Sequence, residues 1–296
     1  MNAQTRPYRG RFAPSPTGEL HFGSLVAAVG SFLQARARNG RWLVRIEDID
    51  PPREVAGAAS SQLKTLQSFG LVPDEPVIFQ RQLGANHQQA LERLLATGHA
   101  YPCGCSRSDL PADGIYPGTC RNGLPPGRTA RSIRVRVDDE EIAFVDGLQG
   151  MQRQNPARQT GDFVVRRADG LVAYQLAVVV DDAASHITEV VRGADLIDST
   201  GRQLHLYRCL GLSAPNYIHL PIVVDEQGEK LSKSTGADPI QRCNATTALR
   251  LALRALGHEP PAAKVAVADQ LDWAQRHWQL TRVPRGPVAI GVQSDR

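Results

Sequence analysis

Two loops of the sequence combine residue types that bind and activate phosphate groups. The first is FAPSPTGELHFGS, residues 12–24, which lies between a predicted strand and a predicted helix. Its prolines restrict the backbone to a stiff turn, and Gly23 lets a ligand approach the main chain closely. Free N–H groups at the start of a helix attract phosphate, and His21 can donate to a phosphate oxygen there. Alone, the loop is equally consistent with a rigid turn, because it matches neither the GxGxxG fingerprint nor a P-loop.

The second loop is KLSKS, residues 230–234, which lies between Gly228 and Gly236. Lysine supplies a point charge for a phosphate chain, and serine supplies a hydroxyl donor. The alternative is an ordinary solvated basic loop. Both loops together predict a nucleotide site.

Three of the five cysteines lie close together in a segment rich in Gly and Pro, with the spacing Cys103-x-Cys105 followed by Cys120. Zinc takes four tetrahedral ligands, and its structural sites are rich in sulfur. The three cysteines leave one ligand position open for Asp109, Asp113 or water, since no histidine lies within the segment. The segment has too few apolar residues to order itself, so we predict one structural Zn²⁺ rather than three buried thiols.

The elements that must position these residues follow from the apolar pattern. Residues 8–13 and 41–50 are predicted strands, joined by a helix over 21–38 that ends at Asn39-Gly40. Such a β-α-β unit predicts an α/β fold with a Rossmann-like parallel sheet covered by helices. Further helices are predicted at 54–69, 86–97, 199–211, 245–256 and 263–278, and further strands at 132–137, 161–167, 172–182 and 218–224.

The composition narrows the class of protein. The chain has 296 residues, 42% of them hydrophobic, and a net charge of +4. The mild positive charge permits an RNA partner without requiring one. The N-terminus has no apolar stretch of a signal peptide, and no apolar run approaches the roughly 18 residues of a membrane span. We therefore expect a cytoplasmic protein with no membrane partner.

The two loops, in this order, resemble the HIGH and KMSKS signatures of class I aminoacyl-tRNA synthetases. HFGS, residues 21–24, stands for the first signature, with Ser24 in place of its last histidine, and KLSKS stands for the second. The segments RFAPSPTGELHFG, RIEDIDPPR, VVRGADLIDSTGRQ and HLPIVVDEQGEKLSKS look like glutamyl-tRNA synthetase across most of residues 9–240. The resemblance implies a class I synthetase core.

It also implies two neighbouring sites. The expected glutamate site comprises Arg11, Phe12, Ala13, Pro14, Ser15, Glu47, Tyr174 and Arg192. The expected ATP site comprises His21, Gly23, Lys230, Ser232 and Lys233, and Mg²⁺ accompanies the nucleotide. The residue chemistry agrees with glutamate, because Arg11 and Arg192 can pair with carboxylates and Glu47 can take the ammonium. His21 and Lys233 are the expected catalytic residues, stabilising charge that develops on the α-phosphate.

Few residues follow the KLSKS loop, so the chain resembles the short paralogues of this family, the glutamyl-queuosine tRNA(Asp) synthetases. That resemblance implies transfer of L-glutamate to queuosine in the anticodon loop of tRNA(Asp). Val178 agrees, because glutamyl-tRNA synthetases tend to carry a polar residue there. In the same family a tyrosine at the position of Tyr116 completes the zinc site with Cys103, Cys105 and Cys120.

The expected organisation has four parts. Residues 1–100 form the first half of the catalytic domain, 101–130 the zinc-binding insertion, 131–240 the second half with the KLSKS loop, and 241–296 a short C-terminal helical region without an anticodon-binding domain. We expect a monomer. Candidate RNA contacts are Arg131, Arg134, Arg136, Arg166 and Arg167; the alternative is that they are alternating strand residues that face solvent.

Three alternatives stay open at this stage. The chain could be a truncated enzyme that charges the 3′ end of tRNA(Glu), an enzyme that adenylates glutamate for a small acceptor, or a non-catalytic regulator that binds glutamate or its adenylate. Retention of His21, Lys230 and Lys233 disfavours the regulator, because binding alone does not need the lysine loop. Asp48 and Asp50 are expected only to orient neighbours or to cap the helix near Arg53.

Overall fold

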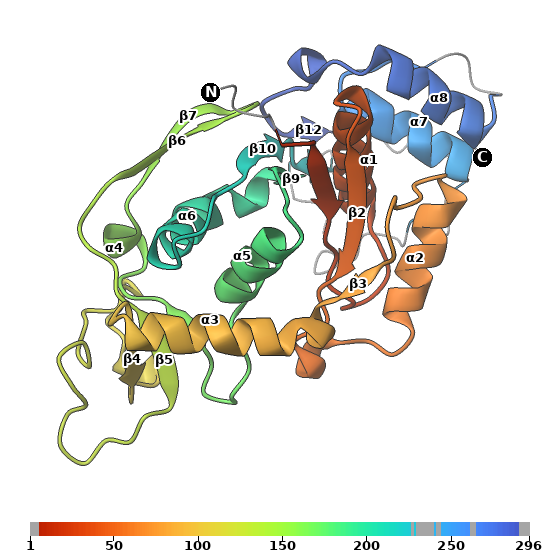
Figure 1. Cartoon of the computed structure of the whole chain (residues 1–296). Helices are drawn as coiled ribbons and strands as arrows, with labels where there is room; N and C mark the ends of the chain where they lie inside the picture. Colours follow the sequence, from red (N-terminus) through yellow and green to blue (C-terminus); the bar gives the residue numbers. More distant parts are fainter. Residues whose placement is uncertain (1–5, 226–227, 229–239, 241–243, 261–264, 290–296) are drawn as a thin grey trace.

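The computed structural model describes residues 6–225, 228, 240, 244–260 and 265–289 (Figure 1). The chain begins with the predicted β-α-β unit, formed by β1 (Arg9–Phe12), α1 (Phe22–Ala37) and β2 (Arg41–Ile46). Strands β1 and β2 pair in parallel, with Arg9 opposite Arg41 and Phe12 opposite Val44. The short β3 (Ile78–Phe79) extends this sheet beyond β2, and α2 (Ala58–Ser68) lies in the connection. The prediction of a Rossmann-like parallel arrangement is confirmed.

A second sheet continues the arrangement on the other side of β1. Its order is β7-β6-β10-β9, formed by β6 (Ile142–Asp146), β7 (Gly150–Gln154), β9 (Glu189–Gly193) and β10 (Asn216–Leu220). Strand β9 runs beside β1, and the N–H of Thr188 donates to the carbonyl of Arg9 at 2.9 Å. Because β1, β2 and β9 lie side by side, their carboxyl ends bring three loops together at one edge.

Helices cover both sheets. Helix α1 packs against β1, β2 and β9, and α7 (Ala245–Ala255) and α8 (Val267–His277) cover its other side. The shared core includes Leu25, Val29, Trp42, Leu249 and Leu253, all essentially inaccessible to solvent. This packing fixes the start of α1, and therefore His21, relative to the strand ends.

A third sheet, entirely antiparallel, carries the cysteine-rich segment. It consists of β4 (Ala100–Cys103), β5 (Ser132–Val135) and β8 (Val164–Arg166). Three helices, α3 (Gly84–Ala96), α5 (Tyr174–Ala184) and α6 (Thr200–Cys209), build a second core beside it, and α4 (Pro156–Gln159) is a single turn. The division of the chain at residues 100, 130 and 240 stays a prediction.

The predicted strand over 172–182 is wrong, because those residues belong largely to helix α5. Three consecutive β-branched residues, 178–180, favour a strand by propensity. Every residue from Gln175 to Asp182 is buried. A helix that is buried on all sides shows no polar face, so its sequence lacks the helical period.

The structure differs from the prediction at two further places. The predicted strand over 218–224 is divided, because Pro221 separates β10 from β11 (Val223–Val224), which pairs with β12 (Val288–Ala289). The hairpin of β6 and β7 was not predicted.

In the part of the chain that the structure describes, we find no helix long and apolar enough to cross a membrane.

Candidate active site and metal centre

A cavity of about 640 Å³ lies at the carboxyl ends of β1, β2 and β9. It is lined by all the residues expected to bind glutamate, Arg11, Phe12, Ala13, Pro14, Ser15, Glu47, Tyr174 and Arg192, and by His21 and Gly23 of the expected ATP site. Other lining residues, including Thr17, Arg53, Gln62 and Asp195, were not predicted. Lys230, Ser232 and Lys233 lie outside the described residues.

The Pro14-Ser15-Pro16 loop is held by main-chain hydrogen bonds rather than by proline stiffness alone. The N–H of Glu47 donates to the carbonyl of Pro14 at 2.9 Å, and the Gln62 amide donates to the carbonyls of Ser15 and Gly18. Gly18 has a φ of 131°, a conformation that side chains with a Cβ rarely adopt. The bond from Glu47 joins the loop after β1 to the segment after β2, and the Gln62 side chain joins the same loop to α2.

His21 is the N-cap residue of α1, and its Nδ1 accepts a hydrogen bond from the N–H of Ser24 at 3.3 Å. An acceptor role at Nδ1 places the proton of a neutral imidazole on Nε2. Nε2 is then a donor at the positive end of the helix dipole, which suits a phosphate oxygen.

Arg192 is buried with neutral partners. Its guanidinium donates to His219 Nε2, Gln203 Oε1, the Leu196 carbonyl and Thr200 Oγ1 at 2.9–3.2 Å. Among the described residues no carboxylate lies within 4 Å of it. A buried cation is costly unless an anion compensates it, so this position suits a ligand carboxylate.

His219 connects Arg192 to a buried carboxylate, Asp146. Its Nδ1 lies 2.6 Å from Asp146 Oδ2 at the end of β6. Burial lowers the pKa of His219, against the opposing effect of Asp146. The neutral ring therefore donates from Nδ1 to Asp146 and accepts at Nε2 from Arg192. Neither His219 nor Asp146 was singled out from the sequence, because the hairpin that carries Asp146 was missed.

Glu47, the residue after β2, and Tyr174, the first residue of α5, both line the cavity. Burial raises the pKa of Glu47, although Arg45 and Arg11 oppose the shift. Burial and the nearby Glu47 carboxylate raise the pKa of Tyr174, so its phenol remains a neutral hydrogen-bonding group. A buried carboxylate beside a cavity suits an ammonium group, which would return the pKa of Glu47 toward its ordinary value.

Asp48 and Asp50 lie next to the cavity and hold arginines, in line with the orienting role expected for them. Asp48 accepts from the main-chain N–H of Arg81 at 2.8 Å and pairs with its guanidinium. Asp50 pairs with Arg53 at 2.5 Å and with Arg167 at 3.1 Å. Asp50 caps no helix with its side chain.

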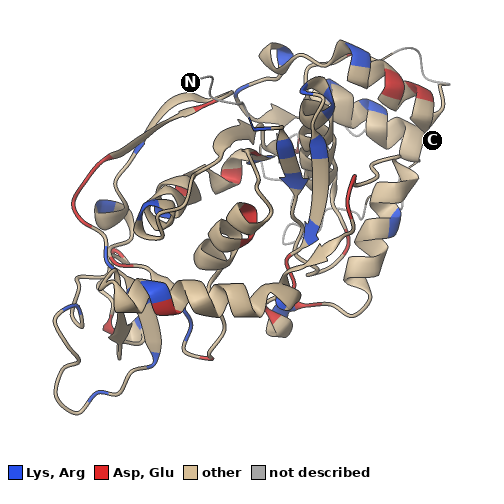
Figure 2. Cartoon of the chain, in the orientation of Figure 1, with Lys and Arg blue, Asp and Glu red and all other residues tan. Residues whose placement is uncertain are grey.

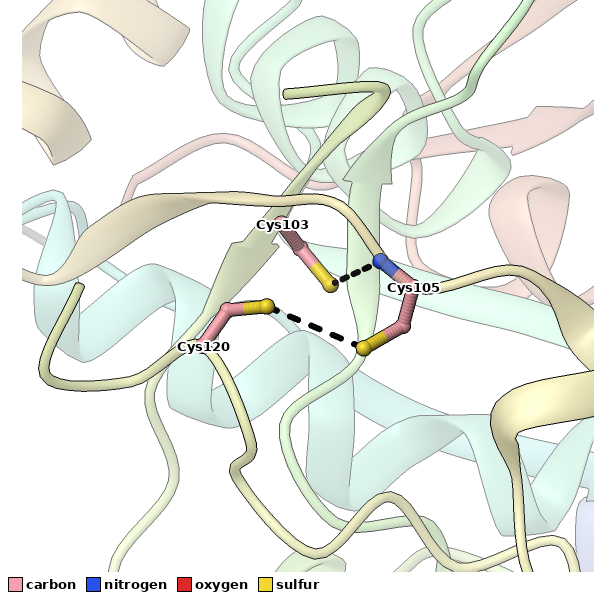
Figure 3. A group of neighbouring side chains, drawn as sticks. All are labelled: Cys103, Cys105 and Cys120. Carbon is pink, nitrogen blue, oxygen red and sulfur yellow. Dashed lines mark hydrogen bonds between the residues drawn. The ribbon is translucent and has the colours of Figure 1, made fainter. Parts of the chain in front are cut away.

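The three cysteines predicted to bind metal converge (Figure 3). The sulfurs of Cys103, Cys105 and Cys120 all lie within 4.8 Å of one another, and all three residues are buried. Cys105 and Cys120 are 3.7 Å apart, and Tyr116 Oη lies 3.4 Å from Cys103 Sγ. A tetrahedral Zn²⁺ with Zn–S bonds of about 2.3 Å separates its sulfurs by about 3.8 Å. The donor set therefore fits zinc.

The pKa of the Cys103 thiol also suits the binding of a cation. Burial opposes ionisation of Cys103, but hydrogen bonds from Tyr116 and the Cys105 N–H lower its pKa to about 7. Burial and the hydrogen bond to Cys103 raise the pKa of Tyr116, whose ring lies 3.9 Å from the Arg134 guanidinium. A bound Zn²⁺ would lower it again, as it does for other ligands.

The two carboxylates considered for the open ligand position, Asp109 and Asp113, form hydrogen bonds elsewhere. Asp109 pairs with Arg128 at 2.8 and 2.9 Å and accepts from the N–H of Ser106 at 2.7 Å. Asp113 accepts from the N–H of Ile115 at 2.9 Å. Tyr116 is therefore a better candidate for the fourth ligand than either carboxylate.

Residues 8–113 and 121–256 match the family described as tRNA synthetases class I (E and Q), catalytic domain. The chain belongs to this family and is a ligase with a glutamyl-tRNA synthetase-like function. Enzymes of this class use ATP with Mg²⁺.

Its relatives are more specific. The chain is 54% identical to the glutamyl-Q tRNA(Asp) synthetase of Chromobacterium violaceum, over 96% of this chain and 97% of that protein. It is 56% identical to the protein of the same name from Burkholderia cenocepacia, over 91% and 97%. The crystal structure of glutamate-tRNA synthetase from Elizabethkingia anophelis superposes with a TM-score of 0.81 at 25% identity, covering 97% of this chain and 68% of that one. The resemblance deduced from the motifs is confirmed.

Proposed function

We propose that the protein activates L-glutamate with ATP and Mg²⁺ and transfers the glutamyl group to queuosine in the anticodon loop of tRNA(Asp). The observation that carries this proposal is the meeting of Arg11, Arg192 and Glu47 in one cavity with His21. Two guanidinium groups and one carboxylate complement the two carboxylates and the ammonium of glutamate. The names of the close relatives support queuosine as the acceptor.

The reaction has two steps. An α-carboxylate oxygen of glutamate attacks the α-phosphorus of ATP, and the bond to pyrophosphate breaks, which gives glutamyl-adenylate. A hydroxyl of the queuosine cyclopentene ring then attacks the glutamyl carbonyl carbon, AMP leaves, and the hydroxyl proton is lost as the ester forms. Both steps depend on positioning and on stabilisation of developing negative charge.

Each group in the site has a role in these steps. His21 Nε2 and Lys233 stabilise charge on the phosphates, and Lys230, Ser232 and the backbone at Gly23 hold the nucleotide. Mg²⁺ neutralises the phosphate chain of ATP when it is bound. The zinc site made by Cys103, Cys105, Tyr116 and Cys120 is structural, because it orders a loop with few apolar residues.

A second cavity supports an RNA acceptor. It has a volume of about 850 Å³ and borders the cysteine-rich segment. Five arginines line it, Arg53, Arg107, Arg131, Arg134 and Arg167, and Arg53 also lines the amino-acid cavity. Guanidinium groups suit phosphodiesters, so the RNA backbone can lie here with its acceptor nucleoside directed toward the adenylate.

The test is transfer of radiolabelled glutamate to three RNAs, in the presence of ATP and Mg²⁺. The RNAs are tRNA(Asp) with queuosine, tRNA(Asp) without it, and tRNA(Glu). Label only on queuosine-containing tRNA(Asp), retained after removal of the 3′ end, is the expected result. Label on the 3′ end of tRNA(Glu) would instead identify a charging enzyme. Pyrophosphate exchange without transfer to any RNA would indicate a small-molecule acceptor.

A further inference from the structure

Four ionisable side chains lie beneath the amino-acid cavity without lining it. Arg45, His87, Asp181 and Asp182 are at most 3% exposed. Taking charges out of water is costly, and a well-packed apolar group at such a position is often as stable. A buried ionic cluster next to a binding site therefore calls for a functional explanation.

Asp182 is the centre of this cluster. Its carboxylate accepts from Arg11 Nε at 3.2 and 3.3 Å and pairs with an Arg45 terminal nitrogen at 2.8 Å. Arg45 extends its other terminal nitrogen to Glu47 Oε1 at 3.3 Å. One carboxylate is thus connected to a cation and to an anion that both line the cavity.

The connection to Arg11 has a specific geometry. Within the described residues, the hydrogen bonds of the Arg11 guanidinium involve Nε only. Asp182 therefore binds the guanidinium at Nε, and the two terminal nitrogens are left for a ligand in the cavity that Arg11 lines. A guanidinium held in this way can present a fixed pair of donors to a carboxylate.

A second row of contacts holds the cluster in place. Asp181 lies 2.6 Å from His87 Nε2 and accepts from Gln80 Nε2 at 2.7 Å. Asp181 and Asp182 are both carried by α5, whose first residue, Tyr174, lines the cavity. Figure 2 shows acidic residues (red) on α5 and basic residues (blue) on β1 and β2, and the ion pairs between these elements include those of Asp182 with Arg11 and Arg45.

We propose that Asp182 is a positioning residue for the amino-acid substrate. It fixes Arg11 directly, and through Arg45 it fixes Glu47, so that the carboxylate-binding and ammonium-binding groups keep one mutual geometry. The proposal rests on the proposed function, in that the ligand of the cavity is glutamate. It predicts that loss of Asp182 weakens glutamate recognition and leaves ATP recognition unchanged.

The experiment measures pyrophosphate exchange, together with glutamate affinity by titration calorimetry, for the full-length wild type and three variants. Asp182→Asn removes the charge at nearly constant shape. Asp182→Glu keeps the charge but moves it by one methylene. Asp74→Asn is the control, because Asp74 also binds an arginine, Arg36, at 2.7 and 3.0 Å, but that arginine does not line the cavity.

For Asp182→Asn we expect the KM and Kd for glutamate to rise about 10- to 100-fold, from the loss of charge-assisted hydrogen bonds. The KM for ATP should stay within about twofold, and Asp182→Glu should give an intermediate rise. Should Asp182→Asn fail to fold, Asp182→Glu alone decides the matter. An unchanged glutamate KM in a folded variant overturns the proposal, and so does an equal rise in both KM values. A wild type without glutamate-dependent exchange would instead contradict the proposed function.

Discussion

Replacement of Tyr116 by phenylalanine tests the metal centre with little change in shape. The phenol oxygen lies 3.4 Å from Cys103 Sγ and 3.9 Å from Cys105 Sγ, and it accepts from the N–H of Cys120 at 2.9 Å. Phenylalanine keeps the ring, which is buried to 3% exposure, and the contact with Arg134. The variant therefore removes a proposed zinc ligand without opening a cavity larger than one oxygen atom.

Two effects contribute to the expected loss. The Cys120 N–H is left buried without its acceptor, at a cost of about 1–3 kcal/mol to the apo fold. The metal loses an anionic oxygen and keeps three sulfurs, with water as the replacement. Weakening one ligand through its surroundings already costs about 10- to 100-fold in metal affinity, so losing a ligand should cost at least that.

The assay is competition for Zn²⁺ with a chromogenic chelator, combined with thermal unfolding before and after metal removal. Tyr101→Phe is the control, because Tyr101 is equally buried in the same cluster but donates to Asp162 rather than to a sulfur. We expect Tyr116→Phe to lose affinity and Tyr101→Phe to keep it. Equal zinc affinity in wild type and Tyr116→Phe would refute the assignment, and three sulfurs with water or another ligand would then make the site.

Changes at the amino-acid cavity and in the lysine loop should have separable effects. Arg192→Lys should raise the KM for glutamate about 10- to 100-fold in pyrophosphate exchange, because lysine lacks the planar fork; an unchanged value would exclude a carboxylate contact. Burial raises the pKa of Glu47, and a bound ammonium would lower it again by favouring the charged carboxylate. Glutamate affinity should therefore fall as the pH falls through that raised pKa. Titration calorimetry at several pH values should show this dependence for the wild type and not for Glu47→Gln. Lys233→Ala should slow adenylate formation by orders of magnitude with an unchanged Tm, whereas a wild-type rate would remove the lysine from the mechanism.

The glutamate-site residues were predicted through the resemblance to glutamyl-tRNA synthetase, and the predicted strands account for Arg11 and Glu47 but not for Arg192 or Tyr174. Arg11 is the second-last residue of β1 and Glu47 follows β2, and a β-α-β unit brings such positions to one edge. The cysteine spacing likewise identified a cluster that the structure brings within 4.8 Å. Local pattern sufficed for Arg11, Glu47 and the three cysteines, since each lies in or next to a predicted element or motif.

The supporting residues were not predicted, because they come from distant segments. His219 and Asp146 meet at 2.6 Å although 73 positions separate them, and Asp182 meets Arg11 across 171 positions. No local period predicts such a contact. The only signal in the sequence was the pair of consecutive aspartates that ends VAYQLAVVVDD, a run without any other charge.

The wrong prediction of a strand over 172–182 and the inference about Asp182 have one physical cause. An amphipathic helix is recognised because its polar face meets water. The two aspartates of α5 meet buried arginines and a histidine instead, so residues 175–182 are all buried and their pattern appears continuous. Two aspartates in the interior are tolerated only where cations compensate them. Here the compensating cations include Arg11 of the amino-acid cavity. The buried ion pairs of the two aspartates therefore explain both why the helix has no exposed polar face and how it is connected to the site.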